Sequence, residues 1–322
     1  MQNNLLFNEL YSEIQKAHYI LLVTHKNPDA DTLACALSLS NYMYENKIKH
    51  KVFNISLKEE LPRRLNFLNR FEKITHEVPK YYDLIIFLDC ADEYRVGYEF
   101  DHTIKSVVID HHLSNSFFAD INIVDAKKGS TAELLYSFYE VNKLTVSKNN
   151  AECLYVGLYD DSSAFTAPRT NKSTFNVLSK LMESKIDVSY ISNKLLQRDS
   201  LARFRLKSKI MNTLELFQEG KIAIIYLDNE WLKETGALVT ECDDVVEDVL
   251  AIGIVSIVAY LRVIDEQIRV SLRSKNNIDL LELANKFGGG GHQNAAGLTI
   301  DSFDIKMAKE KLLEATRYYI LN

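Results

Sequence analysis

Carboxylate and imidazole side chains gather in four short segments of this chain. The segments are His25-x-Asn27-Pro28-Asp29-x-Asp31, Asp89, Asp110-His111-His112 and Asp161. Oxygen-rich ligand sets with one or two imidazoles suit Mn²⁺ or Mg²⁺, whereas a zinc-selective site more often recruits thiolates. If the four segments meet in the fold, they predict a two-metal hydrolytic centre and therefore a phosphoesterase.

Three apolar runs of strand length end where these polar residues begin. The runs are Ile20–Thr24 before His25, Leu84–Leu88 before Asp89, and Val107–Ile109 before Asp110-His111-His112. Short apolar runs alternate with amphipathic stretches throughout the first half, a pattern typical of βαβ units around a parallel sheet. Because open α/β sheets bind ligands at the carboxyl ends of their strands, we expect the three clusters to converge there.

Two helices are expected after the third strand. One begins at Ser130-Thr131-Ala132-Glu133, with Ser or Thr as its cap, and continues through Phe138. The other runs from about Asn150 to Tyr159 and leaves Asp160 and Asp161 at its C-terminal end. Because the helix dipole favours cations there, a carboxylate gains nothing from it, and a ligand role for at least one of the two is favoured.

The rest of the chain predicts a helical linker and a second α/β domain. Periodicity indicates a strand over 222–226, a hairpin of 254–261 with 268–272 through Asp265-Glu266, and helices over 280–287 and 303–319. We therefore predict an α/β protein with a parallel-sheet catalytic domain over 1–190, a basic helical linker over 191–217 and a smaller α/β domain over 218–322. The active site is expected in the cleft between the domains.

Composition narrows the class of protein. The chain has 322 residues, of which 47% are hydrophobic and 25% charged, and this suits a soluble globular protein of one or two domains. No apolar run approaches the roughly 20 residues needed to cross a bilayer, and the N-terminus has no signal-peptide pattern, so a cytoplasmic protein is expected. Its four scattered cysteines are expected to be buried free thiols.

The formal net charge of −6 argues against wide binding to long nucleic acid, which depends on neutralising many phosphates. A small phosphorylated substrate stays compatible with this charge, because metal ions can supply the positive charge at the site of chemistry.

The metal-binding segments also have ordinary structural explanations. Asn27-Pro28-Asp29 can form a turn, Asp31 can cap a helix, and an aspartate such as Asp89 is common after a strand. Two adjacent histidines after a strand are harder to explain in this way. The combination of all four segments favours metal binding.

A glycine run marks the second domain. Gly288–Gly291 is followed by His292 and preceded by Arg273-Ser274. Such a run lets backbone N–H groups approach an anion, although glycine also commonly ends a helix such as 280–287. With the arginine and the histidine, the run predicts a clamp on a terminal phosphate.

Taken together, these motifs resemble the DHH phosphoesterase superfamily, which also contains the RecJ exonucleases and the family II inorganic pyrophosphatases. The four acidic segments match its motifs in order, and Gly288–His292 followed by Ala295-Ala296-Gly297 resembles its DHH-associated C-terminal domain. The similarity extends in particular to bacterial nanoRNases that also dephosphorylate 3′-phosphoadenosine 5′-phosphate. One departure is Asp160-Asp161-Ser162, where the family usually has Thr-Asp-Thr; the motif favours Asp161 as the ligand, and Asp160 adds a charge beside it.

The resemblance implies a role for each residue. His25 and Asp29 bind one metal, Asp31, His111 and Asp161 bind the other, and Asp89 bridges them. His112 faces the substrate and assists the leaving oxygen, with Asp110 supporting the histidines. In the second domain the residues expected to bind substrate are Arg273, Ser274, Gly289, Gly290, Gly291 and His292. Two divalent ions, Mn²⁺ before Mg²⁺, and a homodimer are also implied.

The resulting hypothesis is an enzyme that hydrolyses short oligoribonucleotides to mononucleotides and converts 3′-phosphoadenosine 5′-phosphate to AMP. A phosphodiesterase for linear or cyclic dinucleotides is an alternative, and a family II pyrophosphatase fits the glycine run less well. A nucleotide-binding regulator with structural metals is the non-enzymatic alternative, and the intact set of candidate ligands argues against it.

Overall fold

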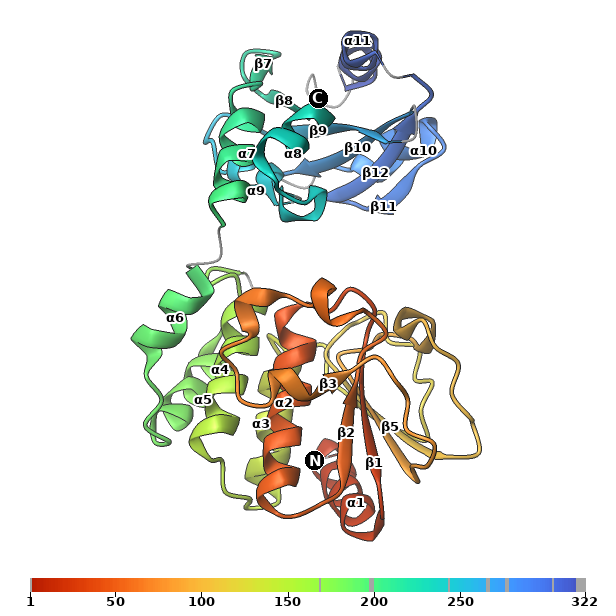
Figure 1. The fold of residues 1–322 in the computed structure, drawn as a ribbon, viewed down its shortest axis with the longest axis vertical. Coiled ribbons are helices and arrows are strands. Elements are labelled where there is room, and N and C mark those ends of the chain that lie inside the picture. Colours follow the sequence, from red (N-terminus) through yellow and green to blue (C-terminus); the bar gives the residue numbers. More distant parts are fainter. Residues whose placement is uncertain are drawn as a thin grey trace. The chain divides into compact units, whose positions relative to one another are not determined.

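The computed structural model describes residues 2–167, 169–196, 200–242, 244–264, 267–275, 278–302 and 304–316. The chain divides into two compact units, Met1–Arg198 and Asp199–Asn322 (Figure 1). Each unit contains its own six-stranded sheet. The predicted α/β class with two sheet-containing parts is therefore confirmed.

The first sheet is entirely parallel, with strand order β3-β2-β1-β4-β5-β6. The three predicted strands lie side by side as β1 (Ile20–Thr24), β4 (Leu84–Leu88) and β5 (Lys105–Asp110). The strands β2 (His50–Phe53), β3 (Ile74–Thr75) and β6 (Ile121–Val124) were not predicted. β1 and β4 are buried along their whole length, as expected for central strands covered on both faces.

Alternate residues of the central strands supply two different cores. Ile20 and Leu22 face the core that holds the helices, whereas Leu21 and Val23 face a smaller core with Phe100. The segment between β4 and β6 covers this second face and contains the short helix η4 (Glu93–Val96). The sheet is thus covered by helices on one face and mainly by loop residues on the other.

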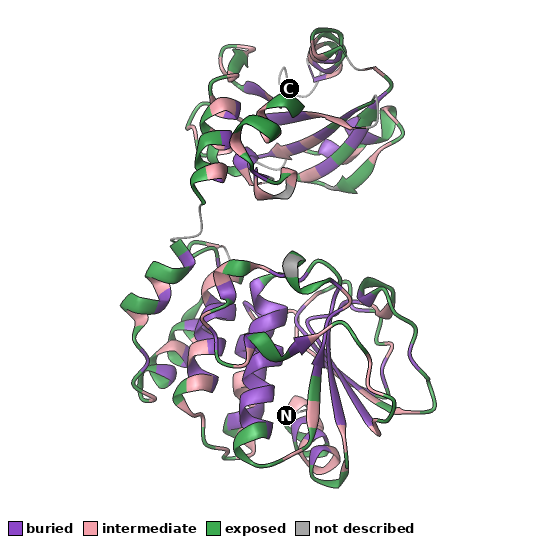
Figure 2. Ribbon diagram, viewed as in Figure 1, coloured by how far each residue is buried: buried purple, intermediate pink, exposed green. Residues whose placement is uncertain are grey.

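Helix α2 (Ala30–Glu45) lies between the sheet and helix α4, and Figure 2 shows it buried along nearly its whole length. Every residue from Ala30 to Met43 is buried. Its polar residues are satisfied inside the core: Ser38 bonds the Tyr139 hydroxyl at 3.1 Å, for example. A helix packed on all sides holds its first turn, where two candidate ligands lie, in a fixed place.

The other helices of the first unit begin at clear caps. Ser130 caps α3, Ser147 caps α4 and Asn171 caps α5. This confirms the two helices predicted after the third strand. Their bounds, with the remaining helical segments, are α1 (Gln2–Lys16), η1 (Lys58–Glu60), η2 (Arg63–Leu65), η3 (Phe71–Lys73), α3 (Thr131–Val141), α4 (Lys148–Asp161), α5 (Lys172–Met182) and α6 (Val188–Leu196).

The second sheet has the order β11-β12-β10-β9-β8-β7, and only its β8–β9 pair is parallel among the described pairs. The predicted hairpin is confirmed as β9 (Ile257–Ile264) with β10 (Gln267–Ser274), although Asp265 and Glu266 lie outside the described residues. The other elements are α7 (Leu201–Met211), β7 (Glu215–Phe217), β8 (Ile222–Leu227), α8 (Asn229–Thr235), η5 (Val239–Cys242), α9 (Val245–Leu250), α10 (Leu280–Lys286), β11 (Gly290–His292), β12 (Ala295–Ile300) and α11 (Ile305–Thr316).

The structure differs from the prediction of one helical linker over 191–217. This stretch contains the end of α6, the separate helix α7 and strand β7, with 197–199 outside the described residues. Ile191 and Leu195 pack in the core of the first unit, and Leu206 and Ile210 pack in a core of the second. The apolar residues of each helix therefore assign it to its own unit, a difference that helical periodicity alone does not reveal.

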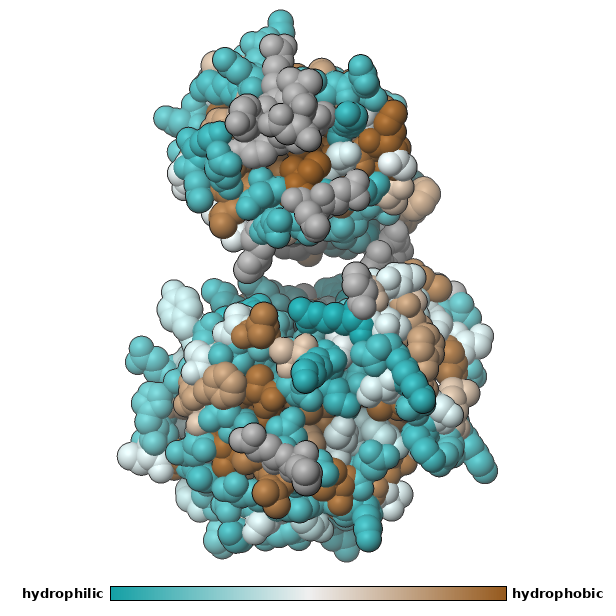
Figure 3. Space-filling model, turned by 180° about the vertical axis from the view of Figure 1, so that it is seen from behind, coloured by the Kyte–Doolittle hydropathy of each residue, from teal (hydrophilic) through white to brown (hydrophobic). Residues whose placement is uncertain are grey.

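The surface is mostly hydrophilic on the face shown in Figure 3, with smaller apolar patches. Scattered exposed apolar residues of this kind are normal for globular proteins. Among the described helices, none has the length and apolar character needed to span a membrane.

Candidate metal centre

All six predicted metal ligands converge in the first unit. His25 follows β1, Asp29 and Asp31 lie at the start of α2, Asp89 follows β4, His111 follows β5, and Asp161 ends α4. Two clusters, in each of which the ligand atoms lie within 4.8 Å of one another, are His25–Asp29–Asp89 and Asp31–His111–Asp161. These are the two groups that the family resemblance implied for separate metals.

Asp89 faces both clusters with different oxygens. Its Oδ2 lies 3.9 Å from His25 Nε2, and its Oδ1 lies 3.8 Å from His111 Nε2. Asp89 has a left-handed φ of 60°, which is uncommon for a residue with a side chain, although aspartate is among those that tolerate it. This conformation follows directly after the strand and accompanies a bridging position of the carboxylate.

Backbone carbonyls orient His25 and His111, the two histidines predicted to bind metal. His25 Nδ1 lies 2.9 Å from the Lys26 carbonyl, and His111 Nδ1 lies 3.3 Å from the Lys128 carbonyl. A carbonyl only accepts, so in these hydrogen bonds each Nδ1 carries the proton and leaves the Nε2 lone pair facing the carboxylates. This is the usual arrangement of metal-binding histidines, and the donor set therefore fits divalent cations.

The N-terminus of α3 holds two of the carboxylates, a role that the sequence reasoning missed. Asp31 accepts hydrogen bonds from the backbone N–H groups of Thr131, at 2.7 Å, and Ala132, at 3.1 Å. The Thr131 hydroxyl donates to Asp89 Oδ1 at 2.7 Å. The signal was present in the predicted helix start, because free N–H groups and the helix dipole favour anions there. The cap of α2 is Asp29 and not Asp31, whose carboxylate is directed to α3 instead.

The carboxylates repel one another in a buried space. Burial, followed by the charges of Asp161 and Asp29, raises the pKa of Asp31 well above its ordinary value, and burial with the same kind of repulsion does so for Asp89. The pKa of Asp161 rises to about 6, mainly through burial and the charge of Asp29. Cations are the natural partners of such a cluster.

His112 forms a third group with Asp89 and His111 whose ligand atoms also lie within 4.8 Å of one another, but its hydrogen-bond partner differs from those of His25 and His111. Its Nδ1 lies 2.7 Å from Asp110 Oδ1, and Asn115 donates to the other oxygen of Asp110 at 2.7 Å. The hydrogen bond that His112 donates to Asp110 raises the pKa of His112 despite burial. Its side chain is 32% exposed, against 3% for His111, so the imidazole reaches the surface of the site.

Asp160, the additional acid beside Asp161, has a partner of its own. Arg64 binds both of its oxygens, at 2.6 and 3.0 Å. Among the described residues, Asp160 belongs to no candidate metal cluster. The extra carboxylate therefore forms a structural ion pair.

In the second unit, the sheet register aligns the predicted substrate residues. Arg273 pairs with Ala295, and Ala295 pairs with His292, whose side chain is outside the described residues. Arg273 Nε donates to Glu247 at 3.0 Å, and the buried Ser274 hydroxyl donates to the Ile278 carbonyl at 2.8 Å. The structure thus places these residues near one another along the sheet, and their binding of substrate stays a prediction.

The glycine run has a packing role that the sequence did not indicate. Gly288, with φ 69°, follows α10, which agrees with the helix-end explanation. A Cβ on Gly291 would lie 2.6 Å from Ala296 Cα, and one on Gly289 would lie 2.8 Å from Leu298 Cα. Close approach of β12 therefore requires glycine at these two positions, whereas a Cβ on Gly290 would meet open space.

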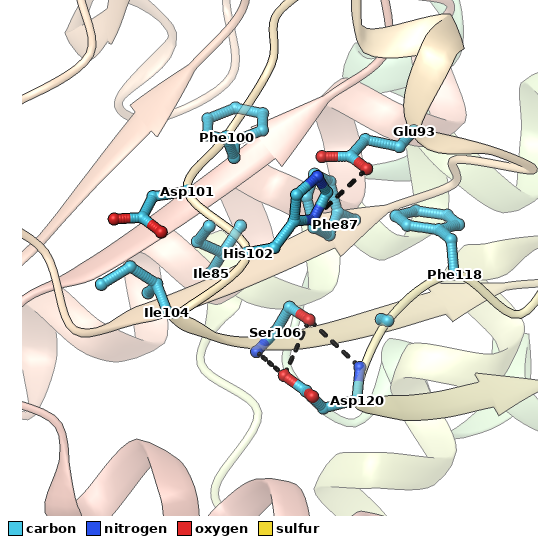
Figure 4. A pocket seen from close by; sticks show the side chains of 11 residues that line it. Ile85, Phe87, Glu93, Phe100, Asp101, His102, Ile104, Ser106, Phe118 and Asp120 are labelled. Carbon is cyan, nitrogen blue, oxygen red and sulfur yellow. Dashed lines mark hydrogen bonds and ion pairs between the residues drawn. The ribbon is translucent and has the colours of Figure 1, made fainter.

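A cavity of about 220 Å³ lies in the first unit (Figure 4). Phe87, Phe100 and Phe118 line it together with polar residues. Asp120 at its edge is already bonded to the Ser106 N–H and hydroxyl, at 2.8 and 3.0 Å. None of the residues that line it belongs to a candidate metal cluster of the described residues.

Comparison with known proteins agrees with this geometry. Residues 19–158 match the model of the DHH family, N-terminal domain, and residues 219–322 match the DHHA1 domain. The chain is a DHH phosphoesterase. Each match lies within one of the two structural units.

A curated relative of the DHH protein is the bifunctional oligoribonuclease and PAP phosphatase NrnA of Thermus thermophilus, with 26% identity over 96% of this chain and 93% of the relative. Among solved structures, an exopolyphosphatase-related protein from Bacteroides fragilis superposes with a TM-score of 0.86 at 24% identity, covering 99% and 98% of the two chains. RecJ from Thermus thermophilus in complex with Mn²⁺ gives 0.55 at 15% identity, covering 98% of this chain and 55% of RecJ. The two structural likenesses confirm the fold.

Gly157→Ala tests how tightly the cluster is packed. A Cβ at this position of α4 would overlap Asp31 Oδ1 and lie 2.7 Å from Ala132 Cβ. Alanine in a helix normally adds about 1 kcal/mol relative to glycine, but here we expect a loss of roughly 1–3 kcal/mol and weaker Mn²⁺ binding. Urea unfolding and calorimetric titration measure both effects. Lys148→Ala on the same helix is the control, and wild-type Mn²⁺ affinity in Gly157→Ala would contradict the prediction.

Asp161→Asn tests the repulsion between the buried carboxylates of the candidate metal centre. Since the pKa of Asp161 is raised from 3.8 to about 6, its charge costs the metal-free fold progressively more stability as pH rises through this range. The metal-free variant should match or exceed the wild-type melting temperature at pH 8, with a smaller difference at pH 5. With Mn²⁺ the order should reverse, because a ligand charge is lost. Differential scanning fluorimetry measures this, and a less stable metal-free variant at pH 8 would be the contrary result.

Proposed function

We propose that this DHH phosphoesterase uses two divalent ions, with Mn²⁺ preferred, to hydrolyse very short RNA to mononucleotides and to remove the 3′-phosphate of 3′-phosphoadenosine 5′-phosphate. The observation that carries the proposal is the convergence of two carboxylate–histidine clusters on Asp89, beside a partly exposed His112. The relative from Thermus thermophilus, whose name combines the two activities, supports the choice of substrates.

In the proposed centre, the candidate ligands divide between two metal ions. Two divalent ions held close together would activate a water molecule and offset the charge of the phosphoryl oxygens. His25 and Asp29, with one oxygen of Asp89, would hold one ion, and Asp31, His111 and Asp161 would hold the other. The support for Mn²⁺ is the oxygen-rich donor set together with the manganese complex of RecJ, a protein of the same fold.

The charge at the site favours additional cations for an anionic substrate. Five carboxylates and two divalent ions sum to about −1, so the ions alone leave no excess of positive charge. Two exposed arginines lie near enough to affect this centre. The charge of Arg95 opposes protonation of His112, and that of Arg169 lowers the pKa of Asp161 against the larger effect of burial. Both are proposed to attract the phosphate.

His112 is the proposed acid for the leaving oxygen. Its Nδ1 is held by Asp110, which leaves Nε2 free to act on the exposed side of the ring. The raised pKa favours the protonated imidazole near neutral pH, the form that donates a proton. Asp110 supports this form without belonging to a candidate metal cluster of the described residues.

The second unit is proposed to recognise the nucleotide through Arg273, Ser274, Gly289–Gly291 and His292. Arg273 suits bidentate contact with a phosphate. In the structure it is paired with the exposed Glu247, and we propose that phosphate replaces this carboxylate. A cleft location for catalysis, a homodimer and a cytoplasmic location stay predictions.

A substrate panel tests the proposed activity. Two- to five-nucleotide RNA, 3′-phosphoadenosine 5′-phosphate, cyclic dinucleotides and pyrophosphate are compared at equal Mn²⁺ concentration. Release of mononucleotide from short RNA and of phosphate from the phosphoadenosine is expected to exceed turnover of the other two by at least about tenfold, equivalent to 1.4 kcal/mol. Chromatography of the products and a phosphate assay measure this.

Asp89→Ala is the control for the panel, since it removes the carboxylate whose two oxygens face His25 of one cluster and His111 of the other. Activity that persists in this variant would indicate a contaminant. Preferential hydrolysis of cyclic dinucleotides would favour the alternative phosphodiesterase, and Mn²⁺-dependent nucleotide binding without turnover would favour the regulator.

Asp110→Asn tests the role of His112. Because the hydrogen bond that His112 donates to Asp110 raises the pKa of His112, replacing Asp110 should lower that pKa. The proton is then lost at lower pH, so the alkaline limb of the profile of kcat against pH should shift downward. Mn²⁺ affinity should change little, and measuring both separates the effects. An unchanged alkaline limb would exclude His112 as the acid.

A further inference from the structure

Glu133 is a fully buried carboxylate that belongs to none of the candidate metal clusters of the described residues. Its two oxygens each accept two hydrogen bonds. Oε1 accepts from Lys128 Nζ at 3.2 Å and from the Ser173 hydroxyl at 2.5 Å. Oε2 accepts from the Gly129 N–H and the Thr174 hydroxyl, both at 3.1 Å. A carboxylate with this many donors is fixed in a single orientation.

An ordinary helix-capping role does not explain these contacts. Ser130 caps α3 and accepts from the Glu133 N–H at 3.1 Å, as in a capping box. In that motif the glutamate returns to the N–H of the cap residue itself. Here it reaches one residue further back, to Gly129, and also bonds two residues of α5. Glu133 therefore joins the loop before α3 to the start of a second helix.

The loop before α3, together with the first residue of that helix, hydrogen-bonds to three of the candidate metal ligands. Lys128, whose ammonium group binds Glu133, provides the carbonyl that orients His111. Two residues after Gly129, Thr131 donates its N–H to Asp31 and its hydroxyl to Asp89. Three ligands thus depend on the position of the segment Lys128–Glu133. Two of them, Asp31 and His111, belong to the cluster with Asp161.

The start of α5, which also hydrogen-bonds to Glu133, is connected to the same metal centre. Ser173 and Thr174 begin α5, and the chain that leads to them from Asp161 includes Arg169. A Cβ on Gly129 would lie 3.3 Å from Glu133 Oε2 and 3.7 Å from the Arg169 carbonyl, so the two segments are in close contact. Glu133 therefore holds together the segments that flank His111 and Asp161.

We propose that Glu133 is a positioning residue that selectively sets the affinity of the metal position formed by Asp31, His111 and Asp161. The cluster His25–Asp29–Asp89 shares only Asp89 with this support and depends on it less. This inference rests on the proposed two-metal function and deepens it. It implies that the segment Lys128–Glu133 fixes the ligands of one metal position more than those of the other.

The ionised form of Glu133 is the one that the contacts require. Burial acts to raise its pKa, but the hydrogen bond from Ser173, the charge of Lys128 and the Gly129 N–H together lower it. All four groups that contact it are donors, so a neutral amide in its place would direct its NH₂ group at two of them. Glu133→Gln therefore preserves shape while disturbing the network.

Titration of Mn²⁺ into metal-free full-length protein, followed by electron paramagnetic resonance and calorimetry, tests the proposal. Wild type should bind two ions. Glu133→Gln should weaken one of them by about 10- to 100-fold, the range typical for loss of a group that orients a metal ligand, and change the other less than about twofold. Ser173→Ala should weaken the same ion to a smaller extent. Glu140→Gln, an exposed position of α3, is the matched control and should change neither.

Asp161→Asn identifies which ion is affected, because it alters a ligand of that cluster alone. Unchanged affinities in folded Glu133→Gln, or an equal loss of both ions, would overturn the inference. If Glu133→Gln does not fold, unchanged binding by Ser173→Ala overturns it. A wild-type chain that binds no divalent ion overturns the proposed function and this inference together, whereas normal wild-type binding with a normal variant overturns the inference alone.

Discussion

Repulsion between buried carboxylates is the constraint on which the first unit depends. Asp31 and Asp89 are almost completely inaccessible, yet each lies close to other acids. Burial of an unpaired charge costs several kcal/mol, and the fold reduces that cost with the N–H groups of α3 and the hydroxyl of Thr131. These contacts stabilise the arrangement without neutralising it. The remaining negative charge favours cations at this centre.

Packing keeps the acids from moving apart. The start of α2 is fixed because the helix is buried between the sheet and α4, and Gly157 of α4 leaves just enough room for the carboxylate of Asp31. The ends of three adjacent parallel strands provide His25, Asp89 and His111. A rigid parallel-sheet edge therefore does most of the positioning, and the helix termini supply the hydrogen bonds.

Much of this arrangement could be predicted from the sequence. Apolar runs that end in Asp89 or in His111 identify strands and their carboxyl ends, and the parallel order then brings the ligands together. The helix beginning at Ser130 was predicted, but the hydrogen bond that it donates to Asp31 was not. A contact across 100 positions leaves no local periodicity in the sequence. The ion pair between Asp160 and Arg64 could not be predicted for the same reason.

The second unit shows a different limit. Its hairpin followed from two apolar runs, whereas the edge strand Glu215–Phe217 is too short to produce a pattern. The glycine run illustrates how one composition serves two purposes. Gly289 and Gly291 allow β12 to approach closely. This packing requirement is visible only in the three-dimensional structure, because in the sequence it looks the same as a glycine run that binds an anion.

The two oxygens of Asp89 are not equivalent. Oδ1, on the His111 side, already accepts a hydrogen bond from Thr131, whereas no described side chain donates a hydrogen bond to Oδ2, which faces His25. A hydrogen bond withdraws electron density from the oxygen that accepts it, so Oδ2 is the stronger electron donor. If two ions bind as proposed, the first would encounter two unequal positions, and the two positions would fill in a preferred order.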